Sequence, residues 1–158
     1  MAVLSQKGHN ATVSLRGENT HRLDEKFRVI IPTALRDALG DKAIVTRGWN
    51  GCLFLYPQET FLAIEQTLMS KPVLNQAAID LKRWFIGSAE EVSVDAQGRM
   101  TIPERLRPYA RIFREVVSVG TGDKIELWGK EAWEQYSNSQ TEIYLKEAAL
   151  ETGLGALG

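Results

Sequence analysis

One stretch of sequence occurs twice in this chain, and the repeat constrains the fold more than any other feature. Residues 23–32 recur as residues 94–103, at an offset of 71 residues. Four pairs of positions carry the same residue in both copies: Asp24 and Asp95, Arg28 and Arg99, Ile31 and Ile102, and Pro32 and Pro103. A match kept over this length is the signature of an internal repeat, so we interpret the chain as two copies of one module.

Each copy predicts the same order of elements. An acidic residue followed by polar and small residues is typical of a turn, and the apolar run after it has the length of a strand. The proline that ends this run predicts a short helix, and two further strands joined by a glycine-containing turn follow. The fourth turn position is Gly98 in the second copy, where positive φ is free of steric cost, but Phe27 in the first. We expect the first turn to be made differently, or Phe27 to take a conformation that bulky residues ordinarily tolerate.

The elements group into an α+β organisation of five segments. A module of about fifty residues builds a poor core alone, so we expect the two copies to share a core or to lean on other subunits. An amphipathic helix with an acidic face is expected over residues 141–150. The segments are a flexible N-terminal extension (1–14), a first module (18–66), a helical connector (67–88), a second module (89–132) and a C-terminal helical tail (133–158).

Charge and composition limit the possible partners. The net charge of the 158-residue chain is −1, which alone argues against a nucleic-acid partner. The positive charge is nevertheless concentrated just after each copy of the motif, in residues 21–47 and 99–114. No apolar run reaches membrane-spanning length and the first residues lack a secretory signal, so we expect a cytoplasmic protein with no membrane partner. The one cysteine, Cys52, is interpreted as a packing residue.

Catalytic chemistry finds little support in the sequence. The two histidines, His9 and His21, precede the first module and have no counterpart in the second; His21 is expected to be exposed on a strand. Glu90, Glu91 and Asp95 could form a cation site, but the first copy has no matching cluster, and an acidic surface is the favoured interpretation. We therefore expect no enzyme activity, no metal, no cofactor and no small-molecule substrate.

The repeated acidic and basic residues allow two interpretations. Asp24 with Arg28, and Asp95 with Arg99, could each be an internal ion pair that stabilises a hairpin. Alternatively, arginine offers a rigid fork of donors that fits a phosphate or the acceptor edge of guanine, and the aspartate holds it in place. Lys26 would then be a phosphate contact. We interpret Arg36 and Arg107 as structural, and the tryptophans as packing residues.

These motifs resemble a known family. The pattern Asp-x-x-Gly-Arg-x-x-Ile-Pro-x-x-Leu-Arg is present twice, with Phe27 replacing the first glycine; residues 85–89 lie between the copies and residues 125–128 near the end. Their order and spacing are similar to the MraZ family of bacterial transcriptional regulators. The resemblance implies two tandem AbrB-like swapped-hairpin β modules packed together, each followed by a helix. It also implies that the Asp-x-x-x-Arg loops contact DNA, here through Asp24, Arg28, Asp95 and Arg99.

The resemblance also implies partners. We expect a ring-shaped homo-oligomer, associated with the nucleoid, that binds double-stranded DNA at repeated boxes in the promoter of a division and cell-wall gene cluster. The alternative is an antitoxin-type AbrB-like module that binds a protein toxin as well as its own promoter. Antitoxins of this kind usually carry one copy and a long charged tail, whereas this chain has two copies and a short acidic helix.

Overall fold

The computed structural model describes residues 14–154. The predicted N-terminal extension falls outside this range except for Ser14, as do His9 and residues 155–158. The elements of the first half are β1 (Leu15–Arg22), β2 (Arg28–Ile30), α2 (Thr33–Leu39), β3 (Lys42–Arg47), β4 (Leu53–Pro57), α3 (Gln58–Met69), α4 (Gln76–Leu81) and the π-helix η1 (Lys82–Ile86). Those of the second half are β5 (Glu90–Ser93), β6 (Arg99–Thr101), α5 (Arg107–Ala110), β7 (Glu115–Gly122), β8 (Ile125–Gly129), α6 (Lys130–Ser139) and α7 (Glu142–Glu151).

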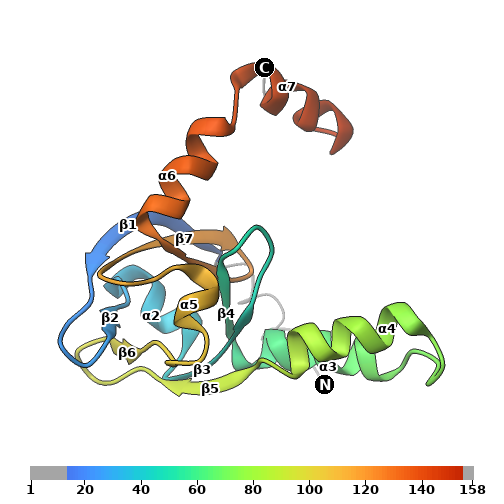
Figure 1. The fold of residues 1–158 in the computed structure, drawn as a ribbon, viewed down its shortest axis with the longest axis horizontal. Coiled ribbons are helices and arrows are strands. Elements are labelled where there is room, and N and C mark those ends of the chain that lie inside the picture. The colour runs from blue at the N-terminus through green and yellow to red at the C-terminus, as the bar shows by residue number, and fades with distance from the viewer. Residues whose placement is uncertain (1–13, 155–158) are drawn as a thin grey trace, which may run out of the picture.

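The strands of the two copies interleave (Figure 1). The larger sheet has the order β1-β7-β8-β4-β3-β5. The first copy contributes β1, β4 and β3. The second copy contributes β7 and β8, which lie between β1 and β4, and β5 at the far edge. The smaller sheet pairs β2 of the first copy with β6 of the second in antiparallel register. This order is symmetric about the pair β8 and β4. Counting outward from it, β7 has β3 as its counterpart in the other copy, and β1 has β5. This architecture is an α+β fold of two AbrB-like modules, as predicted.

The two copies share one hydrophobic core, which confirms the first of the two expectations for so small a module. Val29 of β2 lies opposite Met100 of β6, and both side chains are fully buried. Leu55 of β4 and Ile125 of β8, also fully buried, pair across the centre of the large sheet. Because neither copy encloses these side chains by itself, the buried apolar area that stabilises the fold depends on both.

The short helices after the prolines differ in length between the copies. Pro32 precedes α2 rather than occupying its first turn, and the helix runs for 7 residues before Gly40. In the second copy α5 has only 4 residues and ends at Arg111, which is left-handed with φ 52°. Pro108 lies at the start of α5, where it cannot donate a backbone hydrogen bond. The second copy therefore has the shorter of the two helices.

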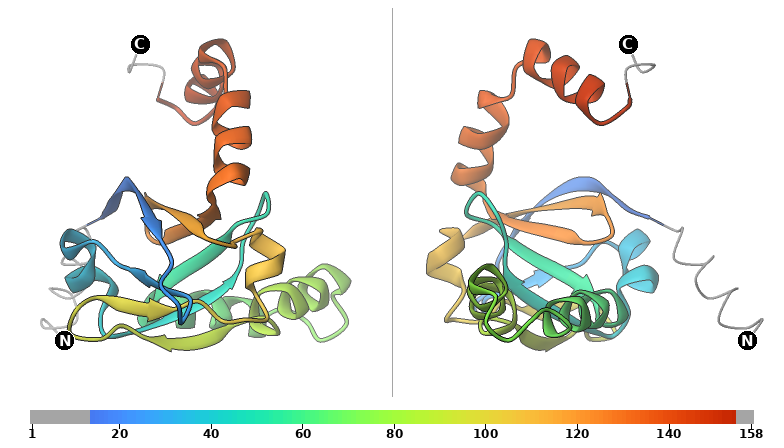
Figure 2. Two further views of the ribbon diagram at one scale, coloured as in Figure 1. Left: turned by 60° about the vertical axis from the view of Figure 1, so that its left-hand side comes forward. Right: turned by 90° about the vertical axis from the view of Figure 1, so that its right-hand side faces the viewer.

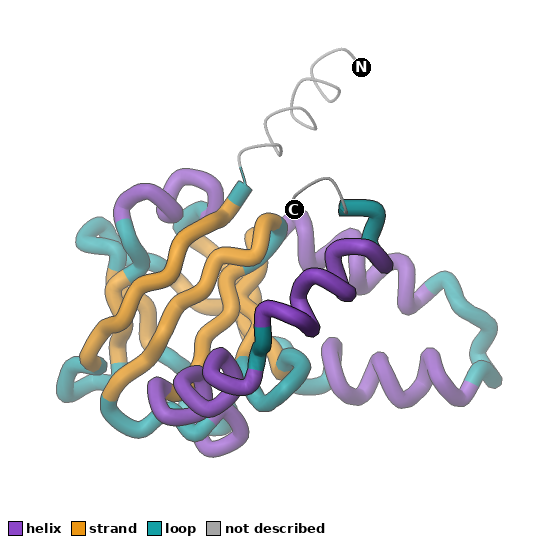
Figure 3. The backbone as a smooth tube through the Cα atoms, turned by 90° about the horizontal axis from the view of Figure 1, so that it is seen from above, coloured by secondary structure: helices purple, strands orange, loops and turns teal. Residues whose placement is uncertain are grey.

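Helical segments extend from the strands in two directions (Figure 2). Figure 3 shows α3 and α4 as a hairpin that reaches out beyond the strands. The Asn75 side chain caps α4 by accepting a hydrogen bond from the backbone N–H of Ala78 at 3.0 Å. α6 and α7 leave the other side of the sheet (Figure 1). Within residues 14–154, no helix combines the length and the apolar character needed to cross a bilayer.

The expectation of an amphipathic C-terminal helix is wrong. The helix α7 forms, and the Thr141 side chain caps it by accepting a hydrogen bond from the backbone N–H of Tyr144 at 3.1 Å. Its apolar residues include Ile143, Tyr144 and Leu145 in succession, and consecutive residues point to different sides of a helix. No residue of α7 is buried, and its apolar side chains lie exposed around the helix.

A second, smaller cluster contains most of the aromatic residues. Trp128 is buried and packs edge to face against Trp133 and at a tilt against Tyr136 of α6. Cys52 is fully buried in the same cluster, which confirms its packing role. The interpretation of all tryptophans as packing residues is only partly right, because Trp49 is 51% exposed although it stacks on Trp84.

Candidate nucleic-acid interface

The loop of the first copy is organised around the carboxylate of Asp24. Its Oδ1 accepts hydrogen bonds from the backbone N–H groups of Lys26 (2.8 Å) and Arg28 (2.9 Å). Its Oδ2 accepts from Nε of Arg28 at 2.7 Å, so the same carboxylate fixes both the turn and the guanidinium. The backbone N–H of Phe27 closes the turn by donating to the carbonyl of Asp24 at 3.0 Å.

The loop of the second copy repeats these bonds. Asp95 accepts from the backbone N–H groups of Gln97 (2.9 Å) and Arg99 (2.8 Å), and from Nε of Arg99 at 2.8 Å. The backbone N–H of Gly98 donates to the carbonyl of Asp95 at 2.8 Å. The repeated sequence therefore produces a repeated local structure, with each arginine held at a fixed point after its turn.

Hydrogen bonds to the charged carboxylates lower the pKa of both aspartates. The largest cause for Asp24 is the backbone N–H of Arg28, and for Asp95 it is the backbone N–H of Arg99. Both carboxylates are therefore ionised at neutral pH. Ion pairs this exposed contribute little to stability, so the consequence of the pairing is mainly that each guanidinium is oriented before any ligand arrives.

Each loop is also fastened by the other copy. The backbone N–H of Ile31 donates to the carbonyl of Gly98 at 2.7 Å, and the backbone N–H of Ile102 donates to the carbonyl of Phe27 at 3.0 Å. The strand that leaves one loop thus ends on the fourth turn residue of the opposite loop. The two loops therefore lie at opposite ends of the β2–β6 ladder. Each loop is hydrogen-bonded to the strand that leaves the other, which fixes the position of one loop relative to the other.

Both expectations for the first turn are wrong. The turn is made in the same way as the second, and Phe27 takes the left-handed conformation with φ 58°, which bulky residues rarely adopt. Gly98 has φ 81° at the equivalent position, as predicted. The bonds to Asp24 and from Ile102 fix the backbone on both sides of Phe27, and they offset the steric cost of the side chain.

Arg36 and Arg107 have structural roles, as interpreted from the sequence. Arg36 Nε donates to the carbonyl of Ile31 at 2.8 Å, and Arg107 Nη1 donates to the carbonyl of Ile102 at 3.2 Å. Each guanidinium also reaches the opposite loop. Arg107 lies over the ring of Phe27, 3.7 Å from its centroid. The guanidinium of Arg36 occupies the space that a Cβ atom at Gly98 would need.

One exposed face presents both loop arginines. In the β2–β6 ladder Arg28 lies opposite Thr101, and Ile30 lies opposite Arg99. Directly opposed residues of antiparallel strands point to the same side, and alternate residues share that side, so these four side chains are on one face. The intervening residues of both strands are buried on the other face. Ile30 is exposed between the two arginines.

The remaining predicted residues separate into exposed and paired groups. Lys26 is exposed on the first loop. Glu90 pairs with Arg105 at 3.1 Å and Glu91 pairs with Lys42 at 3.7 Å. Each acidic residue of the possible cation site therefore has its own cation, and the described residues contain no group of three or more potential metal ligands.

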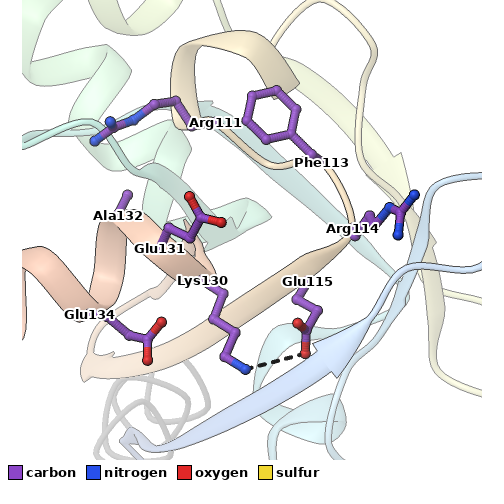
Figure 4. Close-up of a pocket in the computed structure, with 8 residues that line it drawn as sticks. All are labelled: Arg111, Phe113, Arg114, Glu115, Lys130, Glu131, Ala132 and Glu134. Carbon is purple, nitrogen blue, oxygen red and sulfur yellow. Dashed lines mark ion pairs between the residues drawn. The ribbon is translucent and has the colours of Figure 1, made fainter.

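The structure also contains a pocket that the sequence did not predict (Figure 4). It has a volume of about 320 Å³ and is lined by residues of both signs, among them Arg111, Arg114 and Lys130. Lys130 pairs with Glu115 at 3.6 Å, while Arg111 and Arg114 point away from each other. The cations do not converge, so the pocket lacks the geometry of an anion site. No sequence signal marks it, because its lining comes from separated segments.

The expectation of an exposed His21 is wrong. His21 is partly buried in β1, and within the described residues its Nε2 is buried with no hydrogen-bond partner. Burial lowers the pKa of its imidazole, because desolvation disfavours the charged form. His21 lies opposite Val116 of β7, on the strand that leads into the first loop.

Comparison with known proteins agrees with this two-copy architecture. The family model described as "MraZ protein, putative antitoxin-like" matches residues 14–84 and again residues 85–153. The chain belongs to the MraZ family. The two matches to the MraZ model cover nearly all the described residues, one for each copy of the repeat.

Several named relatives are similar over most of their length. The transcriptional regulator MraZ of Clostridium acetobutylicum is 42% identical over 127 residues, which are 80% of this chain and 89% of that protein. The transcriptional regulator MraZ of Halothermothrix orenii is 42% identical over 139 residues, 88% of this chain and 97% of that protein. That of Desulforamulus reducens is 42% identical over 133 residues, 84% of this chain and 93% of that protein.

Proposed function

We propose that this MraZ-family chain is a sequence-specific, DNA-binding transcriptional regulator. It binds repeated boxes in the promoter of a division and cell-wall gene cluster as a ring-shaped homo-oligomer, in the cytoplasm at the nucleoid and without a cofactor. The names of its relatives support the regulatory role. We assign the DNA contacts to the residues of the two loops: Asp24, Lys26, Arg28, Asp95 and Arg99.

The observation that carries this proposal is the shared face of the β2–β6 ladder. Arg28 and Arg99 lie on it at the ends of two antiparallel strands that the same core holds in place. A two-stranded ribbon of this kind is narrow enough to enter the major groove of DNA. Two rigidly mounted arginines on one ribbon can therefore reach one segment of duplex together.

Within each loop the aspartate and the arginine have different roles. The carboxylate of Asp24 engages Nε of Arg28, and in the described part of the chain the terminal nitrogens Nη1 and Nη2 have no hydrogen-bond partner. Those nitrogens can donate to guanine O6 and N7 or to a phosphate. The aspartate fixes the guanidinium beforehand, which reduces the conformational entropy lost on binding. Lys26 beside the turn supplies a phosphate contact that carries no sequence information.

Oligomer formation compensates for a weakly charged DNA-binding surface. A chain with net charge −1 that presents few arginines gains little from phosphate neutralisation at a single site. Several subunits tethered at the spacing of repeated boxes raise the effective concentration of each loop at its site. The apolar side chains exposed on α7 support self-association, since they leave apolar area in water that a neighbouring subunit can cover.

The proposal is tested by fluorescence anisotropy with the full chain and labelled duplexes from the region upstream of its own gene. The Arg28→Ala/Arg99→Ala variant should lose at least about thirtyfold in affinity, since each good arginine contact to a base contributes about 1–3 kcal/mol. A matched control, Arg83→Ala/Lys146→Ala, removes the same charge from exposed helical positions. Equal affinity of the loop variant and wild type, with the oligomer unchanged by light scattering, would exclude this function.

The antitoxin alternative has the description of the family model in its favour. It requires a protein partner that covers the exposed apolar residues of α7. Co-expression of the chain with proteins encoded beside its gene, followed by size-exclusion chromatography, distinguishes the two functions. A stable complex with a neighbouring protein that is toxic when expressed alone would support the antitoxin, whereas a homo-oligomer that binds DNA by itself supports the regulator.

A further inference from the structure

Phe27 gives the first loop a surface that the second loop lacks. The residue is 41% exposed, although it sits in a turn whose equivalent position is glycine. The left-handed φ of 58° is unfavourable for phenylalanine and carries no such penalty for glycine. The backbone bonds of the loop hold this residue in place, but none of them requires an aromatic side chain. The ring is therefore an addition to a turn that forms equally well around Gly98.

The ring is held rigidly and only part of it is accessible. Arg107 covers one face, with its guanidinium carbon 3.7 Å from the ring centroid. Arg107 is itself fixed by its hydrogen bond to the carbonyl of Ile102. Ile102 in turn donates its backbone N–H to the carbonyl of Phe27. The second copy thus supports the ring from behind, and the remaining surface is an apolar edge directly before Arg28.

We propose that this edge of Phe27 contacts the C5-methyl group of a thymine next to the base or phosphate held by Arg28. The inference rests on the proposed DNA-binding function and specifies what its first loop reads. Thymine is the base that offers an apolar group in the major groove, and aromatic side chains are among those that contact it. Insertion between two base pairs is disfavoured, because an inserted ring needs both faces free and Arg107 occupies one.

The second loop cannot make this contact. Gly98 has no side chain, and the space beside it is filled by the guanidinium of Arg36, a hydrogen-bond donor. The two loops therefore present different chemistry at equivalent places. One chain then recognises an asymmetric DNA site. The end bound by the first loop requires a thymine, and the end bound by the second loop does not.

The experiment uses the full chain and a duplex selected by it from a randomised DNA library. Each thymine of the selected duplex is replaced in turn by uracil, which removes only the methyl group. At one thymine the replacement should lower the affinity about fourfold, the effect of uncovering one methyl group. In the Phe27→Gly variant, which restores the residue suited to the turn, the same replacement should have no effect. Phe113→Ala removes an exposed phenylalanine outside the loops and should keep the full uracil sensitivity.

Three results would overturn the inference. A wild-type chain that binds the duplex but responds to no uracil replacement excludes methyl recognition while the proposed DNA-binding function stands. Uracil sensitivity that persists in Phe27→Gly assigns the methyl contact to another residue. Failure of the wild-type chain to select or bind any duplex removes the proposed function and this inference together. Loss of sensitivity in Phe27→Gly alone, with the variant's secondary structure and oligomer unchanged, supports it.

Discussion

The two loops of this molecule have the same backbone and different surfaces. In each, an aspartate accepts two backbone hydrogen bonds and one guanidinium, and a strand from the other copy fixes the fourth turn residue. That residue is Phe27 in one loop and Gly98 in the other. Arg107 covers the ring of the first, whereas Arg36 fills the empty space beside the second.

The difference shows which interactions determine the conformation of the turn. A glycine is not required, since Phe27 takes the same left-handed region. The bonds to the aspartate and the bond from the opposite copy are common to both loops, so we infer that they fix the backbone. The fourth side chain and the arginine behind it are then free to differ, and they set what each loop presents to a ligand.

The largest expected effect on stability comes from making the second loop like the first. Gly98→Phe must displace Arg36 from its hydrogen bond to Ile31, and the new side chain must also accept positive φ. Together these effects should lower the free energy of unfolding by about 2 kcal/mol. Urea denaturation measures this change.

A matched control separates the two contributions. Gly51 also has φ 81°, but nothing lies within 4 Å of the place where its Cβ would be. Gly51→Phe should therefore show the backbone penalty alone, about 1 kcal/mol. If both variants are destabilised equally, Arg36 does not restrict the second loop and the two loops are more alike than the structure indicates.

A smaller effect tests the strain at the first loop. Phe27→Gly should be more stable than Phe27→Ala by about 1 kcal/mol, because both remove the ring and only alanine keeps a Cβ at positive φ. Thermal unfolding of the two variants measures the difference. At Phe113, whose φ is not positive, the order should reverse, since alanine restricts the unfolded chain more than glycine. The same order at both residues would contradict a strained Phe27.

The feature that the loops share predicts equal responses to acid. Folding lowers the pKa of Asp24 and Asp95, so their stabilisation is complete above the unfolded pKa near 3.8 and is lost as pH falls through the lower folded value. Asp24→Asn and Asp95→Asn should each reduce the acid-dependent loss of stability by a similar amount. Unfolding followed by circular dichroism from about pH 5 to 2 measures it. A change confined to one variant would show that the loops are not equivalent.

The smallest predicted effect concerns the strands that lead into the loops. His21 of the first copy corresponds to the buried Val92 of the second. Because folding lowers the pKa of His21, its neutral form is favoured, and stability should fall as pH drops through the unfolded pKa of 6.5. His21→Val should flatten the stability profile between pH 7.5 and 5. An unchanged profile would place the titrating group elsewhere.

Local features of the fold were predictable, while the partnership between the copies was not. The turns at Asp24 and Asp95, the strand after each, and positive φ at Gly98 follow from residue chemistry within a few positions. The pairing of β1 with β7 and β4 with β8 joins residues far apart in the chain, and periodicity carries no information on register between two copies with similar patterns.

The candidate site follows the same division. The loop residues and the ion pairs within them could be predicted because their partners are four residues away. The conformation of Phe27 could not, since the bond from Ile102 and the guanidinium of Arg107 come from the opposite copy. The exposed apolar surface of α7 could not be predicted from helical periodicity, because its apolar residues are consecutive and lie around the helix.

The central claim is that both loops bind the same DNA from one face. It is tested most directly by the affinities of wild type, Arg28→Ala, Arg99→Ala and the double variant for one selected duplex, measured at constant salt and with the oligomer verified. Each single substitution should weaken binding at least about fivefold, and the double variant should lose at least the product of the two effects. A single variant that binds as tightly as wild type would contradict the claim, because one loop would then be dispensable.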